Sequence, residues 1–224
     1  MGDKNLKQYN YFAKHFAVLH SNLDKLTNKC YYLRFKNLLK RKKVLDLGCG
    51  EGKDLKFFLN KGAKIYGIDS SEKMIELASK NLPDSEIKLG YFEKIPFGNS
   101  SFDVVASKYA FQTSKKIDII YKEAYRVLKK NGTFVFLVVH PIRQFMEKKK
   151  KKKDYFKQEI VHSVLFGGKL TVKEPSHSFL EYLSPYFLKH FELIDYDEKF
   201  DPSNAEMVEG SSYPAFLIIK AKKK

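Results

Sequence analysis

The chain has 224 residues, of which 42 are basic and 26 acidic, and its formal net charge at pH 7 is +16. With 43% hydrophobic residues it can bury a full core, yet it contains no apolar run long enough to span a bilayer. The first residues lack the apolar stretch of a signal peptide, so we expect a cytoplasmic protein without membrane insertion. Only two cysteines occur, which excludes a disulfide framework and a cysteine-rich zinc site.

The excess of basic residues has two interpretations. A basic surface attracts phosphate groups, which would suit a nucleic-acid partner. However, the chain has only four arginines, Arg34, Arg41, Arg126 and Arg143. Arginine is the residue that forms bidentate hydrogen bonds with phosphates and bases. The dominance of lysine, with no tryptophan, is also typical of a codon bias toward A and T. The lysine run at 148–153 has the same ambiguity and is expected to form a solvated loop.

Helices and strands alternate along the first two thirds of the chain, which predicts an open, mostly parallel sheet. Asn131-Gly132 is expected to end a helix, because this pair favours helix C-caps. In chain order the elements are helix 6–20, helix 23–40, strand 43–47, helix 53–60, strand 64–68, a helix capped by Ser70 or Ser71 and ending at 81, strand 86–89, strand 102–107, helix 116–130 and strand 133–139.

After residue 140 the pattern changes to lysines and scattered aromatics. A hairpin of 158–165 with 169–173 is expected across Gly167-Gly168. We interpret 140–175 as a cap insertion, and 1–139 with 176–224 as the core domain. A helix at 177–190 and strands 192–199 and 215–223 complete the core, and these two strands are expected to pair as an antiparallel hairpin at the sheet edge.

The segment VLDLGCGEGK at 44–53 is the most informative motif, because an apolar strand runs into three alternate glycines and then a helix. Gly48, Gly50 and Gly52 allow a sharp turn that brings backbone N–H groups close to a ligand. A dinucleotide fingerprint would require a third glycine at position 53, where this chain has Lys53. The motif therefore argues against an NAD-dependent oxidoreductase, but this function stays open as an alternative.

The string D-L-G-C-G-E-G resembles motif I of the class I S-adenosylmethionine (SAM) methyltransferases. Over most of its length the chain is similar to their ubiquinone/menaquinone-methyltransferase-like branch, methyltransferase type 11. The resemblance implies a Rossmann-like, doubly wound α/β fold whose seven-stranded sheet is mostly parallel with an antiparallel last strand. It also implies SAM as cofactor, a small-molecule methyl acceptor, and N-terminal helices that partly cover the cofactor.

Several residues match the cofactor motifs of this family. Asp69 lies 21 residues after Gly48, at the tip of the second strand, where its carboxylate could accept both ribose hydroxyls. Phe92 and Glu93 stand where relatives hold the adenine edge, while Tyr91 replaces the usual acid. The expected cofactor contacts are Tyr9, Tyr11, Asp46, Gly48, Cys49, Gly50, Gly52, Asp69, Ser70, Phe92, Glu93, Ser107 and Tyr109.

Two histidines are candidates for the general base of methyl transfer. His140 in FLVVHPI resembles the family segment F-S-V-E-H-P-I, and His177 in KEPSHSFLEYL resembles Y-H-R-T-x-x-x-Y-L. Histidine can accept a proton near neutral pH. A turn or helix-end role remains open for both residues. No carboxylate cluster for a catalytic magnesium is apparent, and no metal is expected.

Two alternatives share the same cofactor site. An RNA methyltransferase acting on tRNA or rRNA would bind its substrate through the lysines. A non-catalytic protein would bind SAM without transferring the methyl group.

Overall fold

The structure, a computed structural model, describes residues 10–11, 25–149, 151–165, 170–200 and 212–224. The expected helix at 6–20 lies almost wholly outside these residues. Among the described residues, no helix is both long and apolar enough to cross a membrane.

The elements are α2 (Lys25–Leu33), β1 (Lys43–Leu47), α3 (Lys53–Asn60), β2 (Lys64–Asp69), α4 (Glu72–Asn81), β3 (Glu86–Leu89), β4 (Phe102–Lys108), η1 (Phe111–Thr113), α5 (Ile117–Val127), β5 (Leu128–Val139), α6 (Pro141–Glu147), β6 (Ile160–Leu165), β7 (Leu170–Pro175), α7 (Phe179–Tyr182), α8 (Pro185–His190), β8 (Phe191–Lys199) and β9 (Phe216–Lys223).

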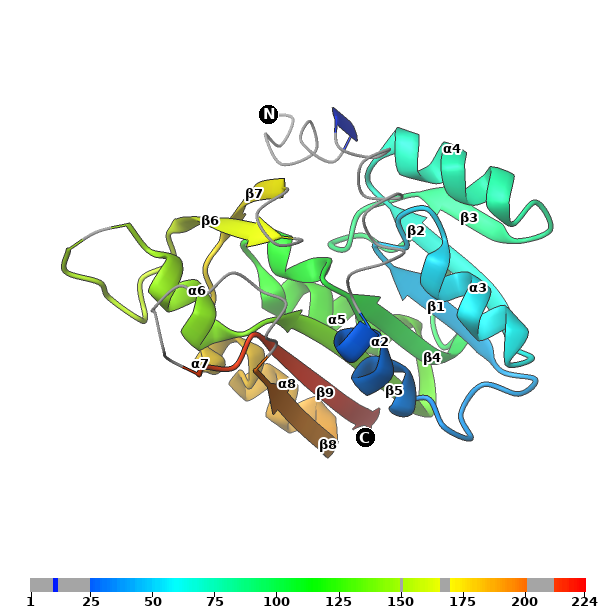
Figure 1. Cartoon of the computed structure of the whole chain (residues 1–224). Helices are drawn as coiled ribbons and strands as arrows, with labels where there is room; N and C mark the ends of the chain where they lie inside the picture. The colour runs from blue at the N-terminus through cyan, green and yellow to red at the C-terminus, as the bar shows by residue number, and fades with distance from the viewer. Residues whose placement is uncertain (1–9, 12–24, 150, 166–169, 201–211) are drawn as a thin grey trace.

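Seven strands form one twisted sheet in the order β3-β2-β1-β4-β5-β9-β8 (Figure 1). Neighbouring strands are parallel in the part β3-β2-β1-β4-β5, whereas β9 runs antiparallel to both β5 and β8. This arrangement confirms the predicted fold class and the hairpin of the last two strands. The strand order reverses between β1 and β4, and open α/β sheets bind ligands at the carboxyl ends of the strands beside such a point.

The sheet is covered on both faces. Because successive side chains of a strand point to opposite faces, Phe134, Phe136 and Val138 of β5 join the core beneath α5, α7 and α8. Val135 and Leu137 join the other core, which packs against α2 and α3. Burial on both faces explains why β5 reads as a continuous apolar run.

A second, two-stranded sheet is formed by β6 and β7, which pair antiparallel (Figure 1). The hairpin agrees with the predicted strands, while its expected turn at Gly167-Gly168 lies outside the described residues. The sequence reading missed α6, which precedes this hairpin. The division into a core and a cap at 140–175 remains a prediction.

Three predicted boundaries were wrong. Helix 23–40 ends at Leu33, and turns lead from there to β1. The helix predicted to end at 130 stops at Val127, because the Asn131-Gly132 pair lies within β5 at an irregularity of its pairing with β4. Helix 177–190 is two helices, since Pro185 has no N–H to donate and starts α8 behind the Ser184 cap.

Candidate functional site

The glycine turn connects β1 to α3 with all three glycines in left-handed conformations: φ is 76° at Gly48, 53° at Gly50 and 88° at Gly52. A Cβ on Gly48 would lie 2.3 Å from Ala110 Cβ, so the loop after β4 packs directly on the turn. A Cβ on Gly50 would meet no described atom within 4 Å. The turn is therefore closed on the Gly48 side and accessible at Gly50.

Asp69 is bound to this turn. Gly50 N donates to Asp69 Oδ2 at 3.0 Å, and Ser71 N donates to Asp69 Oδ1 at 2.9 Å. Burial raises the pKa of Asp69, although these backbone hydrogen bonds oppose the shift. Each carboxylate oxygen can accept a further hydrogen bond, so the two oxygens could still accept the hydroxyls of a ribose. Of the two serines predicted to cap α4, it is Ser71 that does so.

Asp46 and Cys49 lie beneath the turn. Both are buried, and burial raises the pKa of the Asp46 carboxyl and of the Cys49 thiol well above their usual values. Asp46 Oδ1 has no hydrogen-bond partner. Leaving this buried oxygen without a hydrogen bond makes the charged form of Asp46 more costly still.

A buried ion pair that the sequence reading did not identify lies on the same side of the sheet. Lys108 Nζ, at the end of β4, lies 2.8 Å from Asp54 Oδ1 and 2.8 Å from Asn28 Oδ1. Tyr32 of α2 also donates to Asp54 Oδ1, at 2.5 Å. The three contacts fasten α2 and α3 to the strand end. Only folding brings these residues together, because they lie far apart in the sequence.

The remaining predicted cofactor residues differ in their distance from the glycine turn and in their burial. Phe92 lies against Gly48, with its ring 3.4 Å from where a Cβ would be, and Glu93 accepts a hydrogen bond from Ser114 at 2.6 Å. Ser107 is fully buried and donates to Leu47 O, so its hydroxyl joins β4 to β1. Tyr109 has a left-handed backbone, with φ of 51°. Tyr11 is 78% exposed, and Tyr9 lies outside the described residues.

His140 caps α6 and is buried. Its Nδ1 accepts a hydrogen bond from Ile142 N at 3.1 Å, and its Nε2 lies 2.8 Å from Glu198 Oε2. Burial lowers the pKa of His140, an effect that Glu198 opposes. Since Nδ1 accepts, Nε2 carries the hydrogen, and neither nitrogen is free to take a proton from an acceptor. These contacts support a structural role, and the base role remains a prediction.

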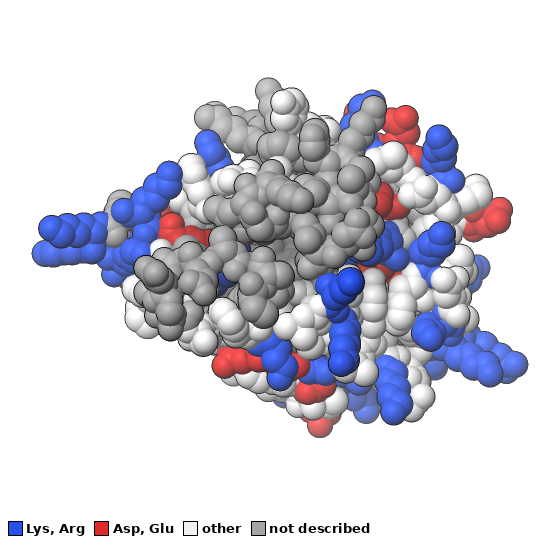
Figure 2. Space-filling model, in the orientation of Figure 1, with Lys and Arg blue, Asp and Glu red and all other residues white. Residues whose placement is uncertain are grey.

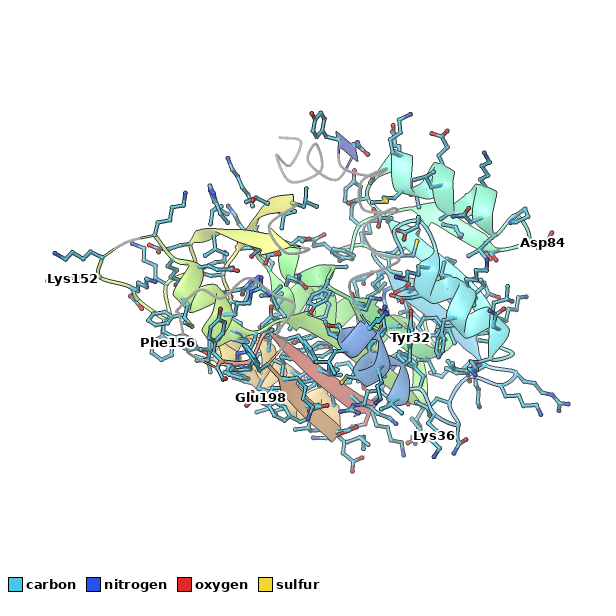
Figure 3. The ribbon with its side chains drawn as sticks, in the orientation of Figure 1. Tyr32, Lys36, Asp84, Lys152, Phe156 and Glu198 are labelled. Carbon is cyan, nitrogen blue, oxygen red and sulfur yellow. The ribbon has the colours of Figure 1, made fainter. Side chains whose placement is uncertain are left out.

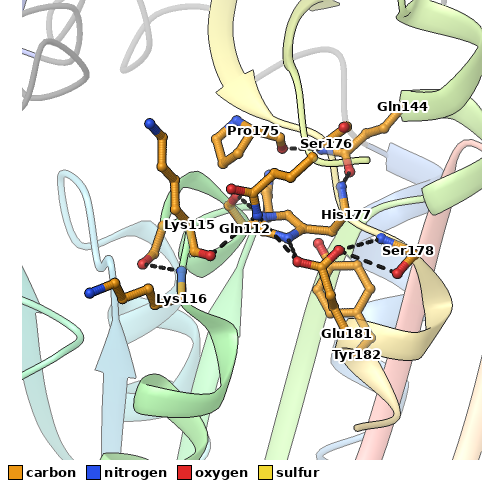
Figure 4. Close-up of polar contacts among 12 residues, drawn as sticks. Gln112, Lys115, Lys116, Gln144, Pro175, Ser176, His177, Ser178, Glu181 and Tyr182 are labelled. Atoms are coloured by element: carbon orange, nitrogen blue, oxygen red, sulfur yellow. Dashed lines mark hydrogen bonds and ion pairs between the residues drawn. The ribbon is translucent and has the colours of Figure 1, made fainter. Parts of the chain in front are cut away.

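His177 joins the segment after β7 to the loop after β4 (Figure 4). Its Nε2 lies 2.8 Å from Gln112 O and its Nδ1 lies 3.1 Å from Glu181 Oε1. Burial acts to raise the pKa of Glu181, but hydrogen bonds from His177 and Ser178 lower it overall. Both ring nitrogens therefore contact oxygen atoms of the protein itself, which supports a structural role for His177, and the base role remains a prediction.

A pair of buried glutamates shares a hydroxyl group between α6 and the β6–β7 hairpin. Ser163 Oγ lies 2.7 Å from Glu147 Oε2 and 2.8 Å from Glu174 Oε1. A hydroxyl group has only one hydrogen to donate, so the site favours protonation of one of the two carboxyl groups, which could then donate to Ser163. Burial, opposed by the nearby Arg143, raises the pKa of Glu147 to about 7, and burial also raises the pKa of Glu174.

Gln112 and Gln144 connect this pair to the end of β4. Gln144 donates to Glu174 Oε1 at 3.2 Å, while Gln112 Nε2 lies 3.5 Å from Glu174 Oε2. The β6–β7 hairpin, α6 and the segment after β4 therefore belong to one polar network. No group of three histidine, cysteine or carboxylate side chains in the described part of the chain could hold a metal ion.

Comparison with known proteins agrees with this geometry. Residues 45–136, from β1 into β5, match the family model described as a methyltransferase domain. This part of the chain is similar to methyltransferase domains. The match confirms the resemblance drawn from the glycine turn, and it includes Asp69 and the end of β4.

Curated proteins of similar sequence include relatives from several bacteria. The chain is 36% identical over 143 residues to an uncharacterized protein of Haemophilus influenzae, covering 58% of this chain and 56% of that protein. It is 37% identical over 101 residues to a demethylmenaquinone methyltransferase of Thermotoga maritima, covering 44% of each. The aligned part thus spans about half the length of these relatives.

Solved structures share the fold over nearly the whole chain. A putative SAM-dependent methyltransferase from Listeria monocytogenes has a TM-score of 0.68 at 27% identity, covering 87% of this chain and 97% of that one. A SAM-dependent methyltransferase from Mesorhizobium loti has a TM-score of 0.72 at 22% identity, covering 90% and 100%.

Proposed function

We propose that this protein is a SAM-dependent methyltransferase that transfers a methyl group to a small-molecule acceptor by in-line displacement. One observation carries the proposal: the Asp69 carboxylate is bound to Gly50 N of the glycine turn at 3.0 Å, so the predicted ribose acceptor and the turn form one rigid cradle. A further glycine, Gly48, is required there because a Cβ would collide with Ala110.

The residues present fit SAM. In the proposed complex, Asp69 holds the ribose hydroxyls, Phe92 lies beside the adenine, and the turn holds the remainder of the cofactor. When bound, SAM supplies an activated methyl group, so the protein mainly has to position the acceptor and exclude water. The proposed cap, with α6 and the β6–β7 hairpin, excludes water from the site of methyl transfer. The proposal requires no metal.

The names of the relatives indicate a first class of acceptor. A Thermotoga maritima relative is a demethylmenaquinone methyltransferase, and a Pelagibacter ubique relative, 35% identical over 97 residues, is a ubiquinone biosynthesis O-methyltransferase. Quinone precursors are therefore the first acceptors to test. The part of the chain after His140, which we expect to select the acceptor, lies outside the range that matches the methyltransferase family model.

The test is a screen of acceptor pools with SAM that is radiolabelled in the methyl group. A labelled small molecule, formed only in the presence of the protein, would support the proposal. Label found in RNA, or SAM binding without any labelled product, would instead favour the RNA methyltransferase or the non-catalytic alternative.

A further inference from the structure

A groove of about 510 Å³ lies on the outer side of α2 and α3, on the face where Figure 3 labels Tyr32 and Lys36. It is formed by the end of α2, the turns that follow it, and the second half of α3. Its walls are made by Lys29, Tyr32, Leu33, Phe35, Lys36, Asn37, Leu39, Lys40, Phe57 and Lys61.

The groove is positively charged. Lys29, Lys36, Lys40 and Lys61 are exposed, no acidic residue lines the groove, and none of the four forms an ion pair with a described carboxylate. The neighbouring Arg34, by contrast, is neutralised by two aspartates of β8. Four unpaired like charges around one concavity focus a positive potential into it. Figure 2 shows basic side chains along the lower right edge, in the region of α2 and α3.

The groove also presents flat rings. Tyr32 and Phe57 are stacked, with ring centroids 3.8 Å apart and an angle of 11° between the ring planes. Both residues are only partly buried, and Lys61 Nζ lies 5.9 Å from the centre of the Phe57 ring. An aromatic surface bordered by cations is the combination that proteins use for unpaired bases and their phosphates.

We infer that this groove binds the phosphodiester backbone of single-stranded nucleic acid, with a base against the Tyr32–Phe57 pair. The four lysines can pair with the phosphate groups of a strand, and the rings provide a contact that an acidic peptide would not use. The inference is independent of the proposed methyl transfer, because the groove follows α2 and α3 rather than the carboxyl ends of the strands.

The test measures the affinity of the full-length protein for a labelled single-stranded RNA 12-mer as a function of salt. In the double variant Lys36→Glu/Lys40→Glu, the slope of log affinity against log salt should decrease by about 1.4, since each lost contact with a single strand contributes about 0.7. The matched control, Lys151→Glu/Lys152→Glu in the cap loop, changes the net charge equally and should leave the slope near the wild-type value. An equal effect in both variants would overturn the inference and attribute binding to net charge.

A third variant tests the rings. Phe57→Leu keeps an apolar side chain and should weaken RNA binding about tenfold while the salt slope stays unchanged, because stacking of one base contributes about 1–3 kcal/mol. Equal affinities for RNA and DNA strands would support recognition of the backbone, and a preference for RNA would add a contact to the 2′-hydroxyl. Equally effective competition by poly-glutamate of matched charge would refute the inference. Unchanged SAM binding in each variant verifies that the fold is intact.

Discussion

At the scale of single residues, Asp69 connects two backbone segments. It accepts hydrogen bonds from the glycine turn and from the start of the segment that leads into α4. In the proposed SAM site, the same carboxylate holds the glycine turn in place and binds the ribose. Gly48 has a purely steric role, because the loop after β4 occupies the space where a side chain would be.

We predict that Asp69→Asn weakens SAM binding by about 10- to 100-fold while the protein remains folded. The reason is that hydrogen bonds to a charged group contribute about 1.5–3 kcal/mol each. Calorimetric titration with SAM measures the loss. Asp84→Asn, at an exposed position labelled in Figure 3, is the control and should bind normally. Unchanged affinity in Asp69→Asn would refute the ribose assignment.

Gly48→Ala is expected to destabilise the protein by about 1–3 kcal/mol, because overpacking adds to the strain of a left-handed backbone. Urea unfolding measures the change in the free energy of unfolding. At Gly98 a Cβ would be 3.5 Å from Ser101 Oγ, an ordinary contact, so Gly98→Ala should have little effect. Equal stability of the two variants would contradict the close approach of Ala110.

At the scale of elements, α6 and the β6–β7 hairpin are held together by buried polar groups. Glu147 on α6 and Glu174 on β7 share the hydroxyl group of Ser163 on β6. Because burial raises the pKa of Glu147 to about 7, we expect the contact between helix and hairpin to depend on pH. His140 and His177 connect the same region to β8 and to the loop after β4.

We predict that Glu147 makes the protein less stable as the pH rises from about 5 to 8. Its pKa in the folded state is about 7, above the ordinary value of 4.5, so the folded state binds more protons than the unfolded state in this range. Stability therefore falls as pH increases, by up to about 3 kcal/mol from this group. Urea unfolding at pH 5 and pH 8 measures the decrease.

Glu147→Gln provides the control for this effect, because glutamine keeps the shape of the side chain and does not titrate. The decrease in stability between pH 5 and pH 8 should be smaller in Glu147→Gln than in the wild type. An identical decrease in both proteins would show that other groups cause it.

For His140 we expect a structural contribution to α6. His140→Ala should lower the free energy of unfolding by about 1 kcal/mol, because the cap acceptor for Ile142 N is lost. His140→Asn retains a cap acceptor and should recover most of the stability and the methyl-transfer rate. A stable His140→Asn variant with strongly reduced turnover would instead support His140 as the general base.

At the scale of the whole molecule, the carboxyl ends of β1, β2 and β4 come together beside the reversal of strand order between β1 and β4. The glycine turn, Asp69 and Lys108 all lie at these ends. The family match covers this part of the chain, while the proposed cap follows β5 and lies outside the match. The proposed cofactor site and the proposed acceptor site thus belong to different segments.

SAM should therefore raise the melting temperature and NAD should not. At a SAM concentration of 100 times the dissociation constant, the stabilisation is about 2.7 kcal/mol, or roughly 5–10 °C for a protein of this size. Differential scanning fluorimetry with each ligand measures the shift. A shift with NAD alone would favour the oxidoreductase alternative.

The sequence by itself determined the fold class and the cofactor turn, because both depend on short-range patterns. Continuous apolar runs indicate buried parallel strands. The three glycines indicate the turn after β1, and Asp69 indicates the carboxylate beside it. Most strand boundaries followed from the same patterns. The prediction was wrong where a local signal competed with strand pairing, as at Asn131-Gly132, and where Pro185 divided a helix.

Only the tertiary structure decided which polar side chains meet. The ion pair of Lys108 with Asp54 joins residues 54 positions apart, and the Ser163 hydroxyl group shared by Glu147 and Glu174 joins residues 27 positions apart. The partners of the two histidines were likewise not apparent from sequence. Contacts of this kind depend on how helices and strands pack in three dimensions, and the local order of residues does not encode them.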